Sequence, residues 1–245
     1  MSDKHIHAQA VEISGLRFSW DGREPVLDIE LIRIERGERV FIEGPSGSGK
    51  STLLSLIAGV IVPQKGDIRV NGKWMSALRG AARDRFRADH IGFIYQMFNL
   101  IPYLSVLDNV TLPCRFSRRR RLRAASRSDN VETEAGRLLQ KLGMGEAAVL
   151  KKPATDLSVG QQQRVAAARA LIGAPEIIIA DEPTSSLDAN HREAFIRLLF
   201  NECGPQETTV IFVSHDATLE RLFGRTIRLA EINQSTGGIK KESRE

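Results

Sequence analysis

The sequence predicts an α/β domain whose sheet is mainly parallel, with an antiparallel β flank and an inserted helical segment. The first observation is a set of three segments with the pattern of buried strands, at residues 39–43, 176–181 and 209–214. Such strands stay apolar when helices cover both faces of their sheet, because neither face then meets water. The second observation is helical spacing of apolar residues at 51–59 and 189–202. Strands that alternate with helices in this way are typical of parallel sheets.

Two further segments complete the expected architecture. Residues 11–70 contain alternating patterns, such as 29–34, that predict the antiparallel flank. Residues 96–157 are rich in arginine, leucine, alanine and glutamate, and their leucines have helical spacing. We interpret this region as a helical subdomain inserted into the α/β domain. We expect the whole domain to span residues 11–232, with mobile tails at 1–10 and 233–245.

Length and composition restrict the class of protein. With 245 residues, of which 42% are hydrophobic and 27% charged, the chain suits one large globular domain. No apolar run reaches the roughly 18 residues that crossing a bilayer requires, so we expect no spanning segment. Cys114 and Cys203 have no partner pattern, which suits a reducing cytoplasm and favours neither a disulfide framework nor a zinc site. The net charge of +5 decides no partner by itself.

The strongest motif lies between the strand at 39–43 and the helix at 51–59, and it matches the phosphate-binding pattern G-x-x-x-x-G-K-[ST]. Its glycines let successive backbone N–H groups turn toward one phosphate cluster, and the following helix adds its positive end. Lys50 would reach the β- and γ-phosphates, and the Ser51 hydroxyl would ligate Mg²⁺. The nucleotide-binding residues predicted here are Gly44, Pro45, Ser46, Gly47, Ser48, Gly49, Lys50, Ser51 and Thr52.

A second motif is the acidic pair Asp181–Glu182 at the end of the apolar run 176–181. Adjacent carboxylates repel each other when they are partly desolvated, and a metal ion removes this cost. We expect Asp181 to hold Mg²⁺, directly or through water, and Glu182 to act as general base on the attacking water. Acidic pairs at strand ends are also common without such a role, so this prediction depends on the neighbouring phosphate loop.

A third motif occupies residues 157–164, Leu-Ser-Val-Gly-Gln-Gln-Gln-Arg, before an apolar helical run at 165–171. Ser158 and Gln161 have the S-x-x-Q spacing of a capping box, which predicts that a helix begins there. From these residues alone, a well-capped helix is a sufficient interpretation.

The order of these motifs resembles that of an ABC transporter ATP-binding subunit. The resemblance extends from about residue 11 to about residue 229, and the segment 157–164 is its most specific part. It implies a P-loop NTPase fold with a RecA-like core, and an enzyme that hydrolyses ATP with Mg²⁺. The residues that carry it are Gly44 to Ser51, Gln96, Leu157 to Arg164, Asp181, Glu182, Ser186, Leu187, Asp188 and His215.

The resemblance also implies a role for each matching residue. Ser158 and Gly160, with Gln161 beside them, would bind the γ-phosphate held by a second copy of the chain, so that ATP joins a head-to-tail homodimer. Asp188 would contact the partner's phosphate loop. Gln96 would contact Mg²⁺ and the attacking water, and His215 would contact the γ-phosphate and orient Glu182. A histidine after a strand is otherwise more often structural.

Trp20 falls where the family places an aromatic residue under the adenine, and an indole can stack on a purine. Leu16, Phe18 and Trp20 would share one face of a strand, so a core position is the alternative. Two residues depart from the common family pattern: Val159 replaces the usual glycine, and Ser186 replaces a common alanine. We expect neither to remove a phosphate contact.

The segments around the phosphate loop and Gln96 resemble the subfamily of macrolide exporters and lipoprotein-releasing systems. This implies a separate membrane permease as partner, a hydrophobic cargo, and a place on the cytoplasmic face of a bacterial inner membrane. The alternative is a non-transport ATPase of the cell-division type that regulates a membrane complex. Residues 115–127, from Arg115 to Arg127, form an arginine-rich stretch that is either a solvated, charge-rich loop or helix, or a contact for anionic lipid. Phe116 is the only aromatic residue of this stretch, too few to stack successive bases, so we expect no nucleic-acid binding.

Overall fold

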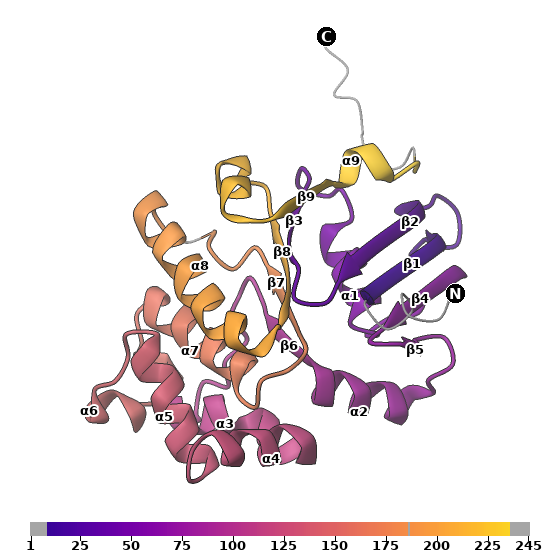
Figure 1. Ribbon diagram of the computed structural model, residues 1–245. Helices are drawn as coiled ribbons and strands as arrows, with labels where there is room; N and C mark the ends of the chain where they lie inside the picture. Colours follow the sequence, from indigo (N-terminus) through magenta and orange to yellow (C-terminus); the bar gives the residue numbers. More distant parts are fainter. Residues whose placement is uncertain (1–8, 186, 236–245) are drawn as a thin grey trace.

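The computed structural model describes residues 9–235 with the exception of residue 186. Two sheets organise the chain (Figure 1). The strands of the first sheet are β3 (Arg39–Glu43), β6 (Ile91–Ile94), β7 (Ile177–Asp181), β8 (Thr209–Ser214) and β9 (Arg225–Arg228). Those of the second are β1 (Gln9–Phe18), β2 (Leu27–Glu35), β4 (Lys65–Val70) and β5 (Lys73–Trp74). The first sheet has the order β6-β7-β8-β3-β9 with parallel pairing, and the second has the order β2-β1-β4-β5 with antiparallel pairing. The predicted α/β fold class is therefore confirmed.

Helices pack around the parallel sheet, and a group of them fills the predicted insertion. The helices outside the insertion are α1 (Lys50–Ile57), α2 (Gly80–His90), α7 (Val159–Leu171), α8 (Ala189–Cys203) and α9 (Leu229–Ile232). Residues 96–157 contain α3 (Val106–Phe116), α4 (Arg118–Arg127), α5 (Val131–Lys141), α6 (Ala147–Leu150) and a short 3₁₀ turn, Ala154–Asp156. Two further 3₁₀ turns are Gly204–Gln206 and Ala217–Leu222. In Figure 1, α3 to α6 lie on the far side of the parallel sheet from the antiparallel sheet.

The parallel strands divide their apolar residues between two cores. On β3, Phe41 packs with the helices of the insertion and α8, whereas Ile42 packs with α1 and the antiparallel sheet. On β8, Phe212 joins the first core and Ile211 joins the second, because successive side chains of a strand point to opposite faces. All four side chains are fully buried. Burial on both faces explains why the central residues of these strands are apolar, with polar residues only at the strand ends.

The structure differs from the expected domain boundaries at both ends. β1 begins at Gln9, two residues before the expected start. Near the other end, Asn233 accepts a hydrogen bond from the Asp28 N–H (2.8 Å) and donates one to the Val26 carbonyl (3.0 Å). These bonds attach residues 233–235 to the edge of β2. The predicted tails, 1–10 and 233–245, therefore included residues that belong to the folded domain. Residues 1–8 and 236–245 lie outside the described part of the chain.

None of the helices between residues 9 and 235 combines the length and the apolar character that crossing a membrane requires.

Candidate functional site

The loops that follow four parallel strands meet at one cleft. The phosphate loop follows β3, Gln96 follows β6, Glu182 follows β7 and His215 follows β8. Carboxyl ends of parallel strands share one edge of a sheet, which is the usual ligand-binding edge of this architecture. The cleft has a volume of about 620 Å³. It is lined by Trp20, Val26, Ser46, Gly47, Gly49, Lys50, Ser51, Thr52, Gln96, Glu182 and His215.

Most of the predicted nucleotide-binding residues therefore come together, with some exceptions. Gly44, Pro45 and Ser48 belong to the same loop but do not line the cleft. Val26 lines it without having been predicted, since a valine before β2 carries no chemical signal in the sequence.

The phosphate loop has the conformation that its glycines permit. Gly47 and Gly49 adopt φ angles of 78° and 96°, a region that residues with a side chain disfavour. Lys50 is only 7% exposed, and its ammonium group donates to the carbonyl oxygens of Gly44 (2.7 Å) and Pro45 (2.8 Å). Among the described residues, no side chain caps the start of α1 at Gly49. The first N–H groups of this helix are therefore available to an anion.

Glu182 stands between the phosphate loop and the loop after β8. One carboxylate oxygen, Oε1, lies 3.5 Å from Lys50 Nζ, and the other, Oε2, lies 2.5 Å from His215 Nδ1. Its backbone has a φ of 46°, and its N–H donates to the Val213 carbonyl (3.0 Å). A left-handed conformation at a residue other than glycine costs about 1–3 kcal/mol and tends to occur at functional sites. The contact between Glu182 and His215 was anticipated only through the family resemblance.

Asp181 has the environment of a cation ligand. Its Oδ1 atom is buried and has no hydrogen-bond partner among the described residues. Burial raises the pKa of this carboxyl group, and a hydrogen bond from the Ser51 hydroxyl opposes that shift. A bound cation would pair with the unpartnered oxygen and keep the carboxylate charged. Among the described residues, no three acidic, histidine or cysteine side chains are placed so that they could hold a metal ion together, so hydroxyl, amide and phosphate oxygens would have to complete the coordination of Mg²⁺.

Trp20 and Gln96 reach the cleft from the two sheets. β1 ends at Phe18, which is 5% exposed, whereas Trp20 is 65% exposed and lines the cleft. The alternative that Trp20 shares a core face with Leu16 and Phe18 is therefore wrong, because the chain leaves the strand before it. The Trp20 ring meets the Phe18 ring edge to face at a centroid distance of 5.0 Å. Gln96 is exposed in the loop after β6.

The predicted capping box begins α7, as expected from the sequence. The Ser158 hydroxyl accepts a hydrogen bond from the Gln161 N–H (3.3 Å), and the Gln161 side chain accepts one from the Ser158 N–H (2.9 Å). Ser158, Gly160 and Gln161 line a second cleft of about 400 Å³ between α7 and α8. Within one chain, these residues are not brought to the phosphate loop.

Asp188 also stays outside both clefts. It caps the start of α8, where its side chain accepts a hydrogen bond from the His191 N–H (3.1 Å). Ser186, one of the two departures from the family pattern, lies outside the described residues.

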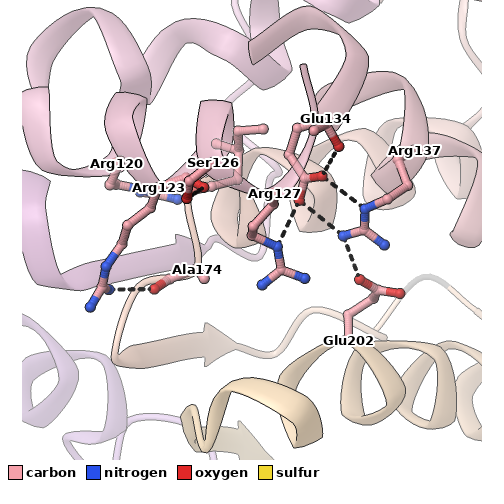
Figure 2. Close-up of polar contacts among 10 residues, drawn as sticks. Arg120, Arg123, Ser126, Arg127, Glu134, Arg137, Ala174 and Glu202 are labelled. Carbon is pink, nitrogen blue, oxygen red and sulfur yellow. Dashed lines mark hydrogen bonds and ion pairs between the residues drawn. The ribbon is translucent and has the colours of Figure 1, made fainter. Parts of the chain in front are cut away.

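The arginine-rich stretch is largely structural, which corrects the expectation of a solvated helix. Arg120 is 3% exposed and donates to the carbonyl oxygens of Ile172 (2.7 Å) and Ala170 (2.5 Å) at the end of α7. Burial lowers its pKa to about 10. In Figure 2, Arg123 reaches the Ala174 carbonyl and Arg127 reaches Glu134, which is 1% exposed.

The acidic partners of these arginines come from other elements. Glu176, at the start of β7, pairs with Arg119 and with Arg123 (2.8 Å). Glu134 on α5 pairs with Arg137, and Arg137 also pairs with Glu202 on α8 (3.0 Å; Figure 2). A charge run in the sequence could not reveal Glu176 as a partner, because it lies more than 50 residues further along the chain.

Comparison with known proteins agrees with this site. The family model described as ABC transporter matches residues 28–185, and the chain belongs to this family. It is an ATP-binding and ATP-hydrolysing subunit of the ABC type.

Three relatives and two solved structures show where it falls within the family. The lipoprotein-releasing system ATP-binding protein LolD of Syntrophotalea carbinolica is 37% identical over 89% of this chain and 90% of its own length. The uncharacterized ABC transporter ATP-binding protein YbbA of Escherichia coli K12 is 40% identical over 82% of this chain and 84% of its own. The macrolide export ATP-binding/permease protein MacB of Escherichia coli is 39% identical over 93% of this chain, which spans only 34% of MacB.

Among solved structures, the dimeric bacterial cassette MJ0796 has a TM-score of 0.76 at 36% identity, and covers 89% of this chain and 93% of its own. A second structure of MJ0796, a dimer bound to ADP and Pi after hydrolysis, matches equally well.

Proposed function

We propose that two copies of the chain bind two ATP molecules head to tail, and that hydrolysis drives a separate membrane permease. The observation that carries this proposal is the split site. The phosphate loop, Glu182 and His215 line one cleft of the chain, whereas Ser158, Gly160 and Gln161 line another. A second copy would supply the missing half of each site, with Asp188 close to the partner's loop. The dimeric structures of MJ0796 support this arrangement.

In the proposed reaction, a water molecule attacks the γ-phosphorus, the bond to ADP breaks, and phosphate leaves. Glu182 accepts the proton of that water as general base, and His215 holds the Glu182 carboxylate in place. Lys50 stabilises the charge on the β- and γ-phosphates. Ser51, Asp181 and Gln96 would hold Mg²⁺, which neutralises charge between the two phosphates when bound.

The remaining contacts of the nucleotide follow the same cleft. The backbone from Gly44 to Gly49 would surround the phosphates, with Ser46 as a hydroxyl donor and Thr52 beside Ser51, both of which line the cleft. Trp20 would stack on the adenine, since its ring is exposed at the rim of the cleft that Lys50 lines.

The permease and its cargo are proposed from the relatives. LolD is named for lipoprotein release and MacB for macrolide export, so we propose a hydrophobic or lipidic cargo that is extracted or exported. The working location would be the cytoplasmic face of a bacterial inner membrane. Affinity purification from gently solubilised membranes should recover a multispanning permease with the chain. Recovery of the chain alone, with full ATPase activity, would contradict this part of the proposal.

We propose that only part of the stretch between Arg115 and Arg127 contacts anionic lipid, since most of its arginines already have partners within the chain. In the described part of the chain, Arg118 and Arg121 form no side-chain hydrogen bond or ion pair. They lie between Phe116 and Leu122, which are 73% and 57% exposed. We therefore propose that these four residues, rather than the whole stretch, meet anionic headgroups.

Liposome sedimentation tests this lipid contact. Replacing Arg118 and Arg121 by glutamine should weaken binding to anionic vesicles by about thirtyfold, because each of the two basic residues near the surface contributes about 1 kcal/mol. Replacing Arg119 and Arg123, which pair with Glu176, is the control with the same charge change. Equal losses from both pairs would mean that only net charge matters.

The test of the central proposal is the Glu182→Gln variant. It should bind ATP, hydrolyse it at least about 100-fold more slowly because the base is lost, and accumulate as a dimer with MgATP. Size-exclusion chromatography with light scattering measures the dimer, and phosphate release measures turnover. Normal hydrolysis by this variant would show that Glu182 is not the base.

A further inference from the structure

We propose that Arg192 is a positioning residue for ATP hydrolysis, which fixes the loop carrying Glu182 against the loop carrying His215. The inference rests on the proposed roles of those two residues. Arg192 itself does not line the nucleotide cleft.

Arg192 lies in the first turn of α8 and joins two loops that are distant in sequence. Its Nε donates to the Leu187 carbonyl oxygen (2.7 Å), and its Nη1 donates to Asp216 Oδ2 (2.5 Å). Leu187 belongs to the loop that leads from Glu182 to α8, and Asp216 directly follows His215. Arg192 and Asp216 are 28% and 20% exposed, so the contact is partly shielded from water.

Asp216 is held firmly enough to transmit this contact to His215. Its Oδ1 accepts hydrogen bonds from both the N–H (3.1 Å) and the hydroxyl (2.6 Å) of Thr218. Its own N–H donates to the Ser214 hydroxyl (3.1 Å). The backbone on both sides of His215 is therefore anchored, and Arg192 attaches this anchored turn to the loop after β7.

The two loops are thus joined at two points. At the cleft, the side chains of Glu182 and His215 meet at 2.5 Å. Outside the cleft lining, Arg192 fixes the separation of the same two loops. Displacement of a catalytic group by about 1 Å can cost about 100-fold in rate, so such a link affects turnover without touching the nucleotide.

Arginine suits this position because its planar group presents several donors at fixed angles. Nε and Nη1 reach a carbonyl and a carboxylate at the same time. A lysine is a single compact cation and would retain only one of the two links.

The chain contains a matched control for this contact. Glu193, the next residue of α8, pairs with Arg221 in the same 3₁₀ turn, Ala217–Leu222, that follows Asp216. This pair also joins α8 to that turn, but it contacts neither Leu187 nor Asp216. Removing it tests whether any loss of this attachment affects hydrolysis.

The experiment measures steady-state hydrolysis of MgATP by the full chain. Arg192→Gln should lower kcat about tenfold and leave KM for MgATP unchanged, because ground-state binding does not use the link. Asp216→Asn should have a similar effect, and the double variant should be no slower than Arg192→Gln alone, since both changes break the contact between Arg192 and Asp216. Arg192→Lys should fall between wild type and Arg192→Gln, and Arg221→Gln should match wild type.

Four other outcomes of these kinetic measurements would overturn the inference. These are a kcat for Arg192→Gln within about twofold of wild type, an equal loss in Arg221→Gln, multiplying effects in the double variant, or a raised KM at unchanged kcat. If Arg192→Gln fails to fold, Asp216→Asn and Arg192→Lys decide the same question. Glu182→Gln is measured in parallel: its normal hydrolysis would refute the proposed function, whereas an inactive Glu182→Gln with a normal Arg192→Gln would refute only this inference.

Discussion

Two helices of this chain begin at residues proposed to bind phosphate, and their first turns differ. α1 starts at Gly49, where no side chain among the described residues caps it. α7 starts at Ser158 with a complete capping box, in which Ser158 and Gln161 satisfy each other's N–H groups. One helix start is open to an anion, and the other is already satisfied by its own chain.

The difference in capping between α1 and α7 matches the two roles proposed for these helix starts. α1 belongs to the loop that would hold ATP throughout the cycle, so its N–H groups are left to the phosphates. α7 would meet a phosphate only when the partner brings one, and must be stable between those encounters. A capping box contributes about 1 kcal/mol to that stability. The Ser158 hydroxyl proton and the Gly160 N–H would still be available to a partner's phosphate.

The largest expected effect on ATP hydrolysis comes from two substitutions, one at the start of each helix, placed in separate copies of the chain. Lys50→Ala should weaken ATP binding, and Gly160→Asp should place a carboxylate against the partner's phosphate. Each variant alone should lose at least about 100-fold of hydrolysis. A mixture should regain activity, because each mixed dimer keeps one intact site made from the phosphate loop of one copy and from Ser158, Gly160 and Gln161 of the other.

Phosphate release from the two variants, separate and mixed, measures this recovery. A Cβ on Gly160 would meet nothing within 4 Å, and the same holds for Gly136 on α5, so Gly136→Asp is the matched control. No recovery on mixing would break the assignment of the two helix starts to different copies.

A second prediction concerns the far end of α7, which also depends on its own chain. Arg120 donates to the carbonyl oxygens of Ile172 and Ala170, which the helix end leaves without partners. Arg120→Leu should lower the free energy of unfolding by about 3 kcal/mol, because buried carbonyls lose a charged donor. Arg121→Leu, at an exposed position of the same helix, should change it by less than about 0.5 kcal/mol. Urea denaturation followed by circular dichroism measures both, and equal effects would mean that the arginines act only through charge.

The smallest predicted effect depends on pH and on Glu176, which follows the turn after α7. Although burial opposes it, hydrogen bonds from His90 and Arg119 lower the pKa of Glu176 from 4.5 to about 2. Since the folded-state pKa lies below the unfolded one, the stabilisation is complete above about pH 4.5 and is lost as pH falls toward 2. Wild type should exceed Glu176→Gln by roughly 2 kcal/mol at pH 7, with the gap narrowing over this window. Chemical denaturation at a series of pH values measures the gap, and a constant gap would show that the carboxylate is not held by these donors.

Patterns within a few residues of each other could be predicted from the sequence alone. The strands 39–43 and 209–214 match β3 (Arg39–Glu43) and β8 (Thr209–Ser214), because burial on both faces selects apolar side chains in the middle of each strand. The capping box at Ser158 was also predictable, since its two partners stand three residues apart.

Other features were decided by tertiary contacts. Trp20 leaves the core because β1 ends at Phe18, and the fold then places its ring at the nucleotide cleft. Arg120 becomes a buried helix cap because α4 packs against the end of α7, 52 residues further along the chain.

The sequence by itself carried the motifs on which the proposed chemistry rests: a loop proposed for phosphate, carboxylates proposed for metal and water, and a capped helix start to which the family resemblance assigns a partner's nucleotide. Only the tertiary structure decided which charged residues join separate parts of the chain, as with Arg192 and Asp216, which are 24 positions apart and form an ion pair. The physical reason is range. Propensity, periodicity and capping act over one or two helical turns, whereas an ion pair between loops exists only after the sheet has brought them together.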